Sequence, residues 1–276
     1  MLIEPFKAGW MDGLCVRARE LPTGQQLHLL IDGAFVPGLH RGIHPDRKGM
    51  LFSSLPGCSD EALDLSSFVT PFDLEDSTVQ RMLHRCSGWP MVSVIQTHED
   101  VRQLAARMAA WTVIEAEGQR FHLRFADTRR IPAIVHVLDQ GQRAQLLGPA
   151  TSWACIARDG AWQEIRLDGA DADLAASPSL DARQFGLLVE DSRIDEMLAL
   201  FMQRHMGPLA PALQGFEVLS LALQVAEKER LTEQAMLDWC EFLWREGQAE
   251  TASTSVVRFA SWQAARADRI ERAVTR

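Results

Sequence analysis

Short apolar runs alternate with helix-like patterns over the first 176 residues, and this alternation constrains the fold more than any other feature of the chain. The apolar runs occupy Leu27–Ile31, Met50–Phe52 and Met91–Ile95. Between them, Ser77 is placed to cap one helix, and Glu99–Trp111 carries apolar residues at helical spacing. The pattern predicts a mixture of strands and helices in this part of the chain.

Turn residues between strand-like runs predict two hairpins in the same region. Gly118 separates Val113–Ile114 from the alternating run Phe121–Phe125. Residues 153–167 form a second pair of runs, with an Asp-Gly dipeptide as the turn between them. We therefore expect a central sheet in the N-terminal part.

Composition changes between residues 168 and 180, where DGADADLAASPSL is rich in small and acidic residues. Such a stretch is typical of a linker. Strand signals fade after it. We expect an α+β protein with a mixed α/β N-terminal lobe over residues 1–176 and an all-helical C-terminal lobe over residues 177–276.

The second lobe shows four helix-like segments. The first is Asp181–His205, which Asp191-Ser192 could interrupt and which Gly207-Pro208 ends. Thr232 is a good N-cap for the third segment, and Gly247 is placed to end it. The remaining segments are Gly215–Arg230, Thr232–Glu246 and a last one from about Ser255 to Val274.

Charge and apolar patterning exclude several classes of protein. A net charge of -9 argues against binding to nucleic acid, which requires a broad basic surface. No apolar run reaches the roughly 18 residues of a membrane span, and the first residues lack the pattern of a signal peptide. The five cysteines are scattered singly, which fits reduced thiols. We expect a cytoplasmic protein without a membrane span.

Motifs for catalysis, metals and cofactors are absent from the sequence. It contains no GxSxG, HExxH, GxxxxGK[ST] or GxGxxG. His40 and His44 have the spacing of a metal-binding pair, but Gly42 and Pro45 break the helix that this arrangement requires. We therefore expect no metal, no cofactor and no enzymatic activity.

The stretch FHLRFADTRRIPAIVHVL, residues 121–138, predicts a strand, a polar corner and a helix. Asp127 ends the strand and can accept amide hydrogens from Arg129 or Arg130, and it can also pair with Arg124 or Arg129. The helix could start at Thr128 or open at Pro132. The corner is interpreted as structural.

An alternative interpretation of the corner is a catalytic one. Arg124 and Asp127 with a histidine, either His122 or His136, could form the polar site of a hydrolase-like enzyme. A compact pocket that converges on these groups would favour it.

The run LRFADTRRI resembles the hallmark of the type VI secretion effector chaperone, or adaptor, family, first catalogued as a bacterial domain of unknown function. In that family a strand ending in Phe-Arg-aromatic-aromatic-Asp-Pro-Arg leads into a helix. Ala126 stands where the hallmark has an aromatic residue, and Thr128 stands where it has proline. The residues that carry this structural signature here are Asp32, Arg124, Phe125, Asp127, Arg129 and Trp153.

Further segments resemble the same family in the same order along residues 25–167. They are LHLLIDGAFVPGL (27–39), KGMLFSSLPG (48–57), SSFVTPFD (66–73), GWPMVSVIQTHEDVRQLAARM (88–108) and LLGPATSWACI (146–156). A weaker helical similarity follows in LALQVAEKERLTEQAMLDWCEFLWREG.

The resemblance implies a non-enzymatic loading factor of the cytoplasm. Such proteins bind a specific toxic effector, often through its N-terminal region, and help to mount it on a spike protein of the valine-glycine repeat type. In some cases a proline-alanine-alanine-arginine tip protein takes part. They are not expected to be secreted with the cargo.

Apolar residues of the helical lobe are the candidates for contact with such a partner. Trp239, Phe242 and Trp244 lie within six positions, so we expect that they do not all face one core. The candidate contacts are Trp239, Phe242, Trp244, Met202 and Met206.

Overall fold

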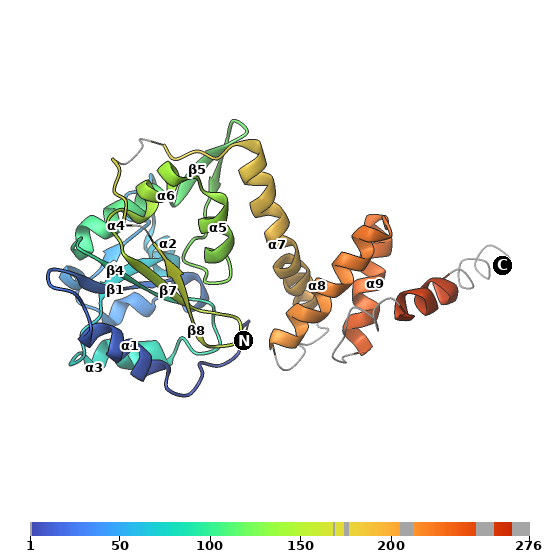
Figure 1. Ribbon diagram of the computed structural model, residues 1–276, viewed down its shortest axis with the longest axis horizontal. Helices are drawn as coiled ribbons and strands as arrows, with labels where there is room; N and C mark the ends of the chain where they lie inside the picture. The colour runs from blue at the N-terminus through green and yellow to red at the C-terminus, as the bar shows by residue number, and fades with distance from the viewer. Residues whose placement is uncertain (1, 168, 174–176, 205–211, 247–256, 267–276) are drawn as a thin grey trace. The chain divides into compact units, whose positions relative to one another are not determined.

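The computed structural model describes residues 2–167, 169–173, 177–204, 212–246 and 257–266 (Figure 1). The chain divides into two compact units, Met1–Asp191 and Ser192–Arg276. The division falls inside helix α7 (Ala182–Gln203), whereas the change in composition places it after residue 176.

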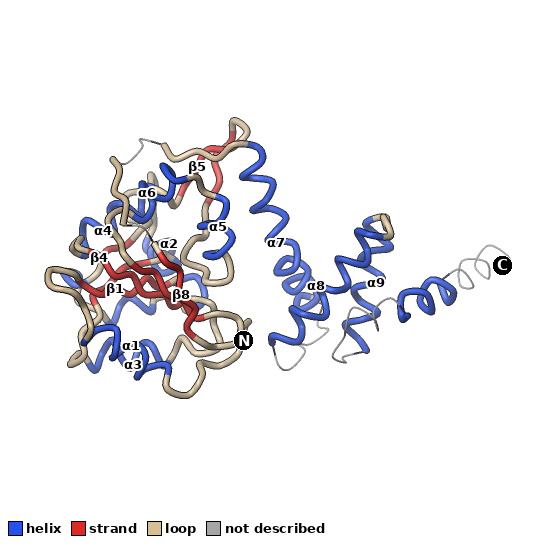
Figure 2. Tube along the Cα trace, in the orientation of Figure 1, coloured by secondary structure: helices blue, strands red, loops and turns tan. Residues whose placement is uncertain are grey.

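A six-stranded antiparallel sheet lies at the centre of the first unit (Figure 2). Its strands, in spatial order, are β2 (Gly49–Met50), β3 (Phe68–Pro71), β1 (Gln26–Ile31), β4 (Val92–Thr97), β7 (Ser152–Ile156) and β8 (Trp162–Arg166). The apolar runs Leu27–Ile31 and Met91–Ile95 supply the inner strands β1 and β4, whereas Met50–Phe52 contributes only to the edge strand β2. The predicted central sheet is confirmed.

Both faces of this sheet are covered, which explains why its strands read as continuous apolar runs. In β1, Leu27, Leu29 and Ile31 belong to one core cluster, while Leu30 belongs to the other. Neighbouring side chains of a strand point to opposite faces, so the alternation assigns one cluster to each face.

Helices of the first unit pack against each of these clusters. The cluster that contains Leu29 also takes in residues of α1 (Trp10–Arg19) and α3 (Ser77–His84). The cluster that contains Leu30 takes in α4 (Val101–Ala110), α5 (Ile131–Val137) and α6 (Gln140–Leu147). A further short helix, α2 (Asp60–Leu65), contacts the turn after β1. The mixed α/β character expected of this region is confirmed.

The hairpin predicted around Gly118 forms a separate two-stranded sheet of β5 (Val113–Ala116) and β6 (Gln119–His122). Glu117 and Gly118 both have positive φ, which is the conformation of a tight two-residue hairpin turn. The alternating run predicts a strand that continues to Phe125, but the observed strand β6 ends at His122. The amide of Phe125 bonds to the carbonyl of Leu123 at 3.0 Å, so the chain turns away from the sheet there.

Most of the described residues of the second unit are helical. They form the end of α7, α8 (Ala212–Lys228), α9 (Glu233–Glu246) and a helix over 257–266. Asp191-Ser192 does not interrupt α7, and the side chain of Thr232 accepts a bond from the amide of Ala235, as an N-cap does. Gly207, Pro208 and Gly247 lie outside the described residues. The α+β class with a helical C-terminal part is confirmed.

Candidate functional site

Two segments that are far apart in the sequence meet at one corner of the first unit. The first is the turn after β1, where Asp32 precedes the short 3-10 helix η1 (Gly33–Phe35). The second is the polar corner after β6, residues 123–130. We call the cluster of Asp32, Phe35, Arg124, Asp127 and Arg129 the DR corner.

Asp32 organises the first half of the DR corner. Its side chain is buried, and its Oδ1 accepts a hydrogen bond of 3.1 Å from the amide of Ala34. The next residue must be glycine, because a Cβ on Gly33 would lie 2.3 Å from the carbonyl oxygen of Ser66. The Asp-Gly pair therefore combines a cap with a close approach of two backbones.

Arg124 connects the two halves of the corner. Its Nη2 donates to Oδ2 of Asp32 at 2.7 Å and lies 3.8 Å from Oδ2 of Asp127. The guanidinium also lies over the ring of Phe35, 5.1 Å from its centroid. Because 41% of the Arg124 side chain is exposed, this cation reaches the surface while its partner Asp32 is buried.

Asp127 is held by Arg129 with the two-pronged geometry that suits a carboxylate and a guanidinium. Nε and Nη2 of Arg129 donate to Oδ1 and Oδ2 of Asp127 at 3.0 Å and 2.7 Å. The amide of Arg129 adds a third bond to Oδ1 at 3.1 Å. The predicted capping of the corner by Asp127 and its pairing with Arg124 and Arg129 are confirmed.

The segment that precedes β4 supports both halves of the corner. The carbonyl of Met91 accepts from the amide of Asp32 at 3.0 Å, and the carbonyl of Pro90 accepts from the amide of Thr128 at 2.9 Å. Trp89 stacks on Phe35, with 6.1 Å between the ring centroids. One short segment therefore fixes the backbone of both sequences that meet here.

The helix after the corner begins late. α5 starts at Ile131, and Pro132 occupies its first turn, where a missing amide hydrogen costs nothing. Of the two starts that the sequence allowed, the one near Pro132 holds. The side chain of Arg130 contacts the N-terminal half of α7. Its Nη2 donates to the carbonyl of Leu188 at 2.6 Å, and its Nη1 lies 2.6 Å from the carboxylate of Asp191.

The other two residues of the structural signature lie in the core. Phe125 and Trp153 belong to the cluster that contains Leu30, and the indole nitrogen of Trp153 donates to Oγ of Ser93 at 2.9 Å. The signature therefore has two parts, the polar residues of the DR corner and two aromatic residues of the hydrophobic core.

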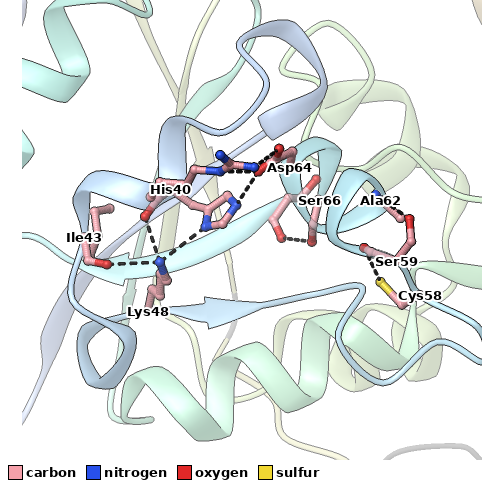
Figure 3. A network of polar contacts seen from close by, with 10 residues as sticks. His40, Ile43, Lys48, Cys58, Ser59, Ala62, Asp64 and Ser66 are labelled. Carbon is pink, nitrogen blue, oxygen red and sulfur yellow. Dashed lines mark hydrogen bonds and ion pairs between the residues drawn. The ribbon is translucent and has the colours of Figure 1, made fainter.

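A second polar network ties the loop after β1 to α2 (Figure 3). Asp64 of α2 accepts bonds from Nε of Arg41 at 2.8 Å and from Nε2 of His40 at 3.2 Å. Nδ1 of His40 faces the ammonium of Lys48 at 3.2 Å, which also donates to the carbonyl oxygens of His40 and Ile43. Burial, followed by the charge of Lys48, lowers the pKa of His40.

The network gives His40 a structural partner and leaves it apart from His44. The Nδ1 of His44 accepts from the amide of Asp46 at 3.3 Å, where it caps a 3-10 turn. Within the described ranges, no group of three or more histidine, cysteine, aspartate or glutamate side chains is arranged to hold a metal ion. The His40/His44 spacing does not assemble into a site there.

Among the described residues, the partners of Asp127 are Arg124 and Arg129, and neither histidine of the catalytic alternative pairs with it. The ring of His122 packs against Phe52, with 5.1 Å between centroids, and partial burial followed by the charge of Arg124 lowers its pKa. His136 is exposed on α5. Among the hydrogen bonds of the described residues, none joins Asp127 to either histidine, and Arg129 occupies both carboxylate oxygens.

The three aromatic candidate residues of α9 pack in one core cluster, contrary to the expectation from their spacing. Trp239 and Trp244 are buried, and Phe242 packs against the same cluster. The reason is that α9 is covered on more than one side. Trp244 contacts Phe201 of α7, while Trp239 contacts Phe259 and Trp262 of the helix over 257–266.

The two methionines among the candidate contacts have different outcomes. Met202 is 39% exposed near the end of α7, so part of this residue is accessible to a partner. Met206 lies outside the described residues.

Sequence reasoning missed Phe35, whose ring contacts the guanidinium groups of both Arg124 and Arg129 in the DR corner. The available signal was the Asp-Gly-Ala-Phe string that follows the predicted strand Leu27–Ile31.

Residues 27–145 match the model of a protein family described as a domain of unknown function (DUF4123). The match contains every residue of the DR corner and ends before Trp153. No curated protein and no solved structure matches the chain significantly.

None of the helices in the described ranges is both long enough and apolar enough to cross a lipid bilayer.

Proposed function

We propose that this protein is a cytoplasmic chaperone, or adaptor, for a toxic effector of a type VI secretion system. It binds the effector, through the effector's N-terminal region, and helps to load it onto a spike protein of the valine-glycine repeat type. A tip protein can join this assembly. The protein acts by binding, carries no catalytic activity of its own and stays behind when the cargo is secreted.

The observation that carries this proposal is the contact between Asp32 and Arg124. The two residues belong to separate stretches that resemble the effector chaperone family, the Asp-Gly-Ala turn and the arginine-containing hallmark. These stretches are far apart in the sequence, yet the hydrogen bond brings their polar residues into one cluster. The family model that matches residues 27–145 is described only as a domain of unknown function, and it spans both stretches. This match is compatible with the resemblance.

The bonding state of the DR corner supports binding over catalysis. A carboxylate that acts as a general base or nucleophile needs a free oxygen directed at a substrate. Asp127 is occupied by Arg129 through both oxygens, and Asp32 by Arg124 and an amide. No described contact favours the hydrolase-like alternative around Arg124 and Asp127.

Coexpression with the products of neighbouring genes tests the proposal. The tagged protein is produced together with each candidate effector and spike protein, and complexes are isolated by affinity and then by size-exclusion chromatography. We expect one effector to copurify, to stay in solution only in the presence of this protein, and to lose binding when its N-terminal region is deleted.

The outcome that would overturn the proposal is a folded protein that binds neither an effector nor a spike protein encoded beside it. Cell fractionation supplies an independent readout, because the protein should remain in the cytoplasm of cells that release the effector. An activity assay tests the hydrolase alternative. We expect the purified protein not to hydrolyse ester or phosphoester substrates.

A further inference from the structure

An apolar groove lies on the helical unit, where its lining residues form part of the border of the aromatic core. It has a volume of about 510 Å³ and is open to solvent. Its floor is formed by aliphatic and thioether side chains of three helices and one turn, namely Met197, Leu200, Leu223, Leu231 and Met236. Cavities of roughly 300 to 1,000 Å³ hold small ligands, so this one has room for a few side chains of a bound segment.

Carboxylates predominate at the rim of this groove. The one arginine there, Arg193, is already neutralised by Glu227, with 2.5 Å between Nη1 and Oε1, and its Nη2 lies 3.3 Å from Sδ of Met236. The other charged lining residues are Glu196 and Glu233, both exposed. Glu196 accepts a bond from Ser192, and neither glutamate takes part in an ion pair among the described residues.

We propose that this groove binds an amphipathic helical segment of a partner protein, whose apolar face is flanked by lysine or arginine. Apolar side chains spaced at i, i+3, i+4 and i+7 would enter the groove, as in other helix-in-groove complexes. The basic residues beside them would pair with Glu196 and Glu233, so a segment with acidic flanks is repelled. This inference rests on the proposed function, in which the partner is the effector.

The floor is suited to a segment of variable sequence. Met197 and Met236 are both half-buried, and the unbranched thioether side chain adapts to partners of different shape. Leu200 and Leu231 are half-buried as well, so part of their apolar surface would leave water only when a partner binds. The floor therefore supplies affinity, and the rim selects by charge.

Synthetic peptides test this groove without the effector. The probe is a labelled peptide of about 15 residues with leucines at helical spacing and lysines beside them, and its counterpart has glutamate in place of every lysine. We expect the lysine peptide to bind the full-length protein at least about tenfold more tightly than the glutamate peptide, measured by fluorescence anisotropy.

Variants locate the binding to this groove. Leu200→Glu places a charge on the floor and should weaken binding of the lysine peptide by at least about tenfold. The double variant Glu196→Lys/Glu233→Lys should reverse the preference toward the glutamate peptide, and it changes only exposed residues. Glu217→Lys, an exposed substitution of the same charge on α8 outside the groove, is the matched control and should bind like the unmodified protein. Circular dichroism of each variant verifies that the helices are intact.

The inference fails if the lysine peptide does not bind, or if it binds Leu200→Glu and the double charge reversal as it binds the unmodified protein. The effector experiment separates this failure from failure of the proposed function. An effector that copurifies equally well with unmodified protein and with both groove variants leaves the chaperone function standing and removes the groove from it. An effector that is lost from the groove variants but retained by Glu217→Lys supports both.

Discussion

Arg124 donates a hydrogen bond of 2.7 Å to the buried carboxylate of Asp32, a residue 92 positions earlier in the chain. The pair joins the turn after β1 to the corner after β6. It also sets an asymmetry, since Asp32 is enclosed whereas Arg124 is partly exposed. Removing the arginine alone therefore leaves the buried carboxylate of Asp32 without its ion-pair partner, whereas removing both charges does not.

The single substitution Arg124→Met should lower the free energy of unfolding by about 2 kcal/mol, because Asp32 is left with only the amide of Ala34. The double variant Asp32→Asn/Arg124→Met should regain about half of this loss, as the charge is gone. Urea denaturation measures both. Lys7→Met breaks the exposed ion pair with Asp159 and should cost no more than about 0.5 kcal/mol. Equal losses in the free energy of unfolding for Arg124→Met and Lys7→Met would show that the Asp32–Arg124 pair stabilises the fold no more than an exposed ion pair does.

Thr128 gives a second test at the position where the chaperone hallmark has proline. Its hydroxyl oxygen is buried without a hydrogen-bond partner, while its amide donates to Pro90 at 2.9 Å. Thr128→Val should therefore raise the free energy of unfolding by up to about 1 kcal/mol, and Thr128→Pro should lower it by about 1 kcal/mol or more through loss of the amide bond. Thermal melting curves of the two variants show whether each substitution raises or lowers stability. If the proline variant is the more stable of the two, the amide bond to Pro90 contributes nothing to the corner.

Arg107 of α4 carries the third prediction. Its side chain is buried, and it donates hydrogen bonds of 2.8 Å from Nε to Glu99 and of 2.8 Å from Nη2 to Asp171. The guanidinium also packs against Gly148, where a Cβ would lie only 2.4 Å from Nε. Arg107→Met should lower the free energy of unfolding by about 3 kcal/mol, since the carboxylate of Glu99 is buried.

The same substitution should expose the chain near Asp171 to proteases, because the carbonyl of Ala172 also accepts from Arg107. Limited proteolysis followed by mass spectrometry detects this cleavage. Arg102→Met, an exposed position of the same helix, is the control and should leave both stability and cleavage unchanged. Cleavage that is no faster in Arg107→Met than in Arg102→Met would remove the anchoring role.

Features that depend on a few neighbouring residues could be predicted from the sequence. The hairpin turn at Gly118, the cap of α9 by Thr232 and the capping of the corner by Asp127 each follow from contacts within about four positions. The α+β class follows from the change of pattern along the chain. These predictions hold because local hydrogen bonds form with little help from the rest of the fold.

Features that depend on distant contacts could not be predicted. Nothing in the sequence pairs Asp32 with Arg124, even though the resemblance singled out both residues. The helix over 257–266 buries Trp239, and helical spacing within α9 does not reveal that second covering. The apolar groove takes its lining from three helices, so no single stretch carries its signal.

His28 provides the last prediction, which concerns pH. This residue of β1 is fully buried, its Nε2 is bonded to the carbonyl of Glu99 at 2.9 Å, and its Nδ1 has no hydrogen-bond partner. Burial lowers the pKa of His28 in the folded protein. The unfolded chain binds a proton near pH 6.5 and the folded protein only at lower pH, so the unfolded state binds more protons between these values.

The contribution of His28 to stability is therefore complete above about pH 6.5 and is lost as the pH falls toward its folded pKa, by up to about 1.4 kcal/mol per pH unit. His28→Gln keeps a donor for Glu99 and removes the titration, so its free energy of unfolding should fall less steeply between about pH 6.5 and pH 5. His136→Gln, which removes an exposed imidazole from α5, controls for the loss of a histidine as such. Urea denaturation at several pH values compares the slopes. Parallel slopes for His28→Gln and the unmodified protein would show that protonation of this buried ring does not drive acid unfolding, and would move that role to the other histidines with lowered pKa, His40 and His122.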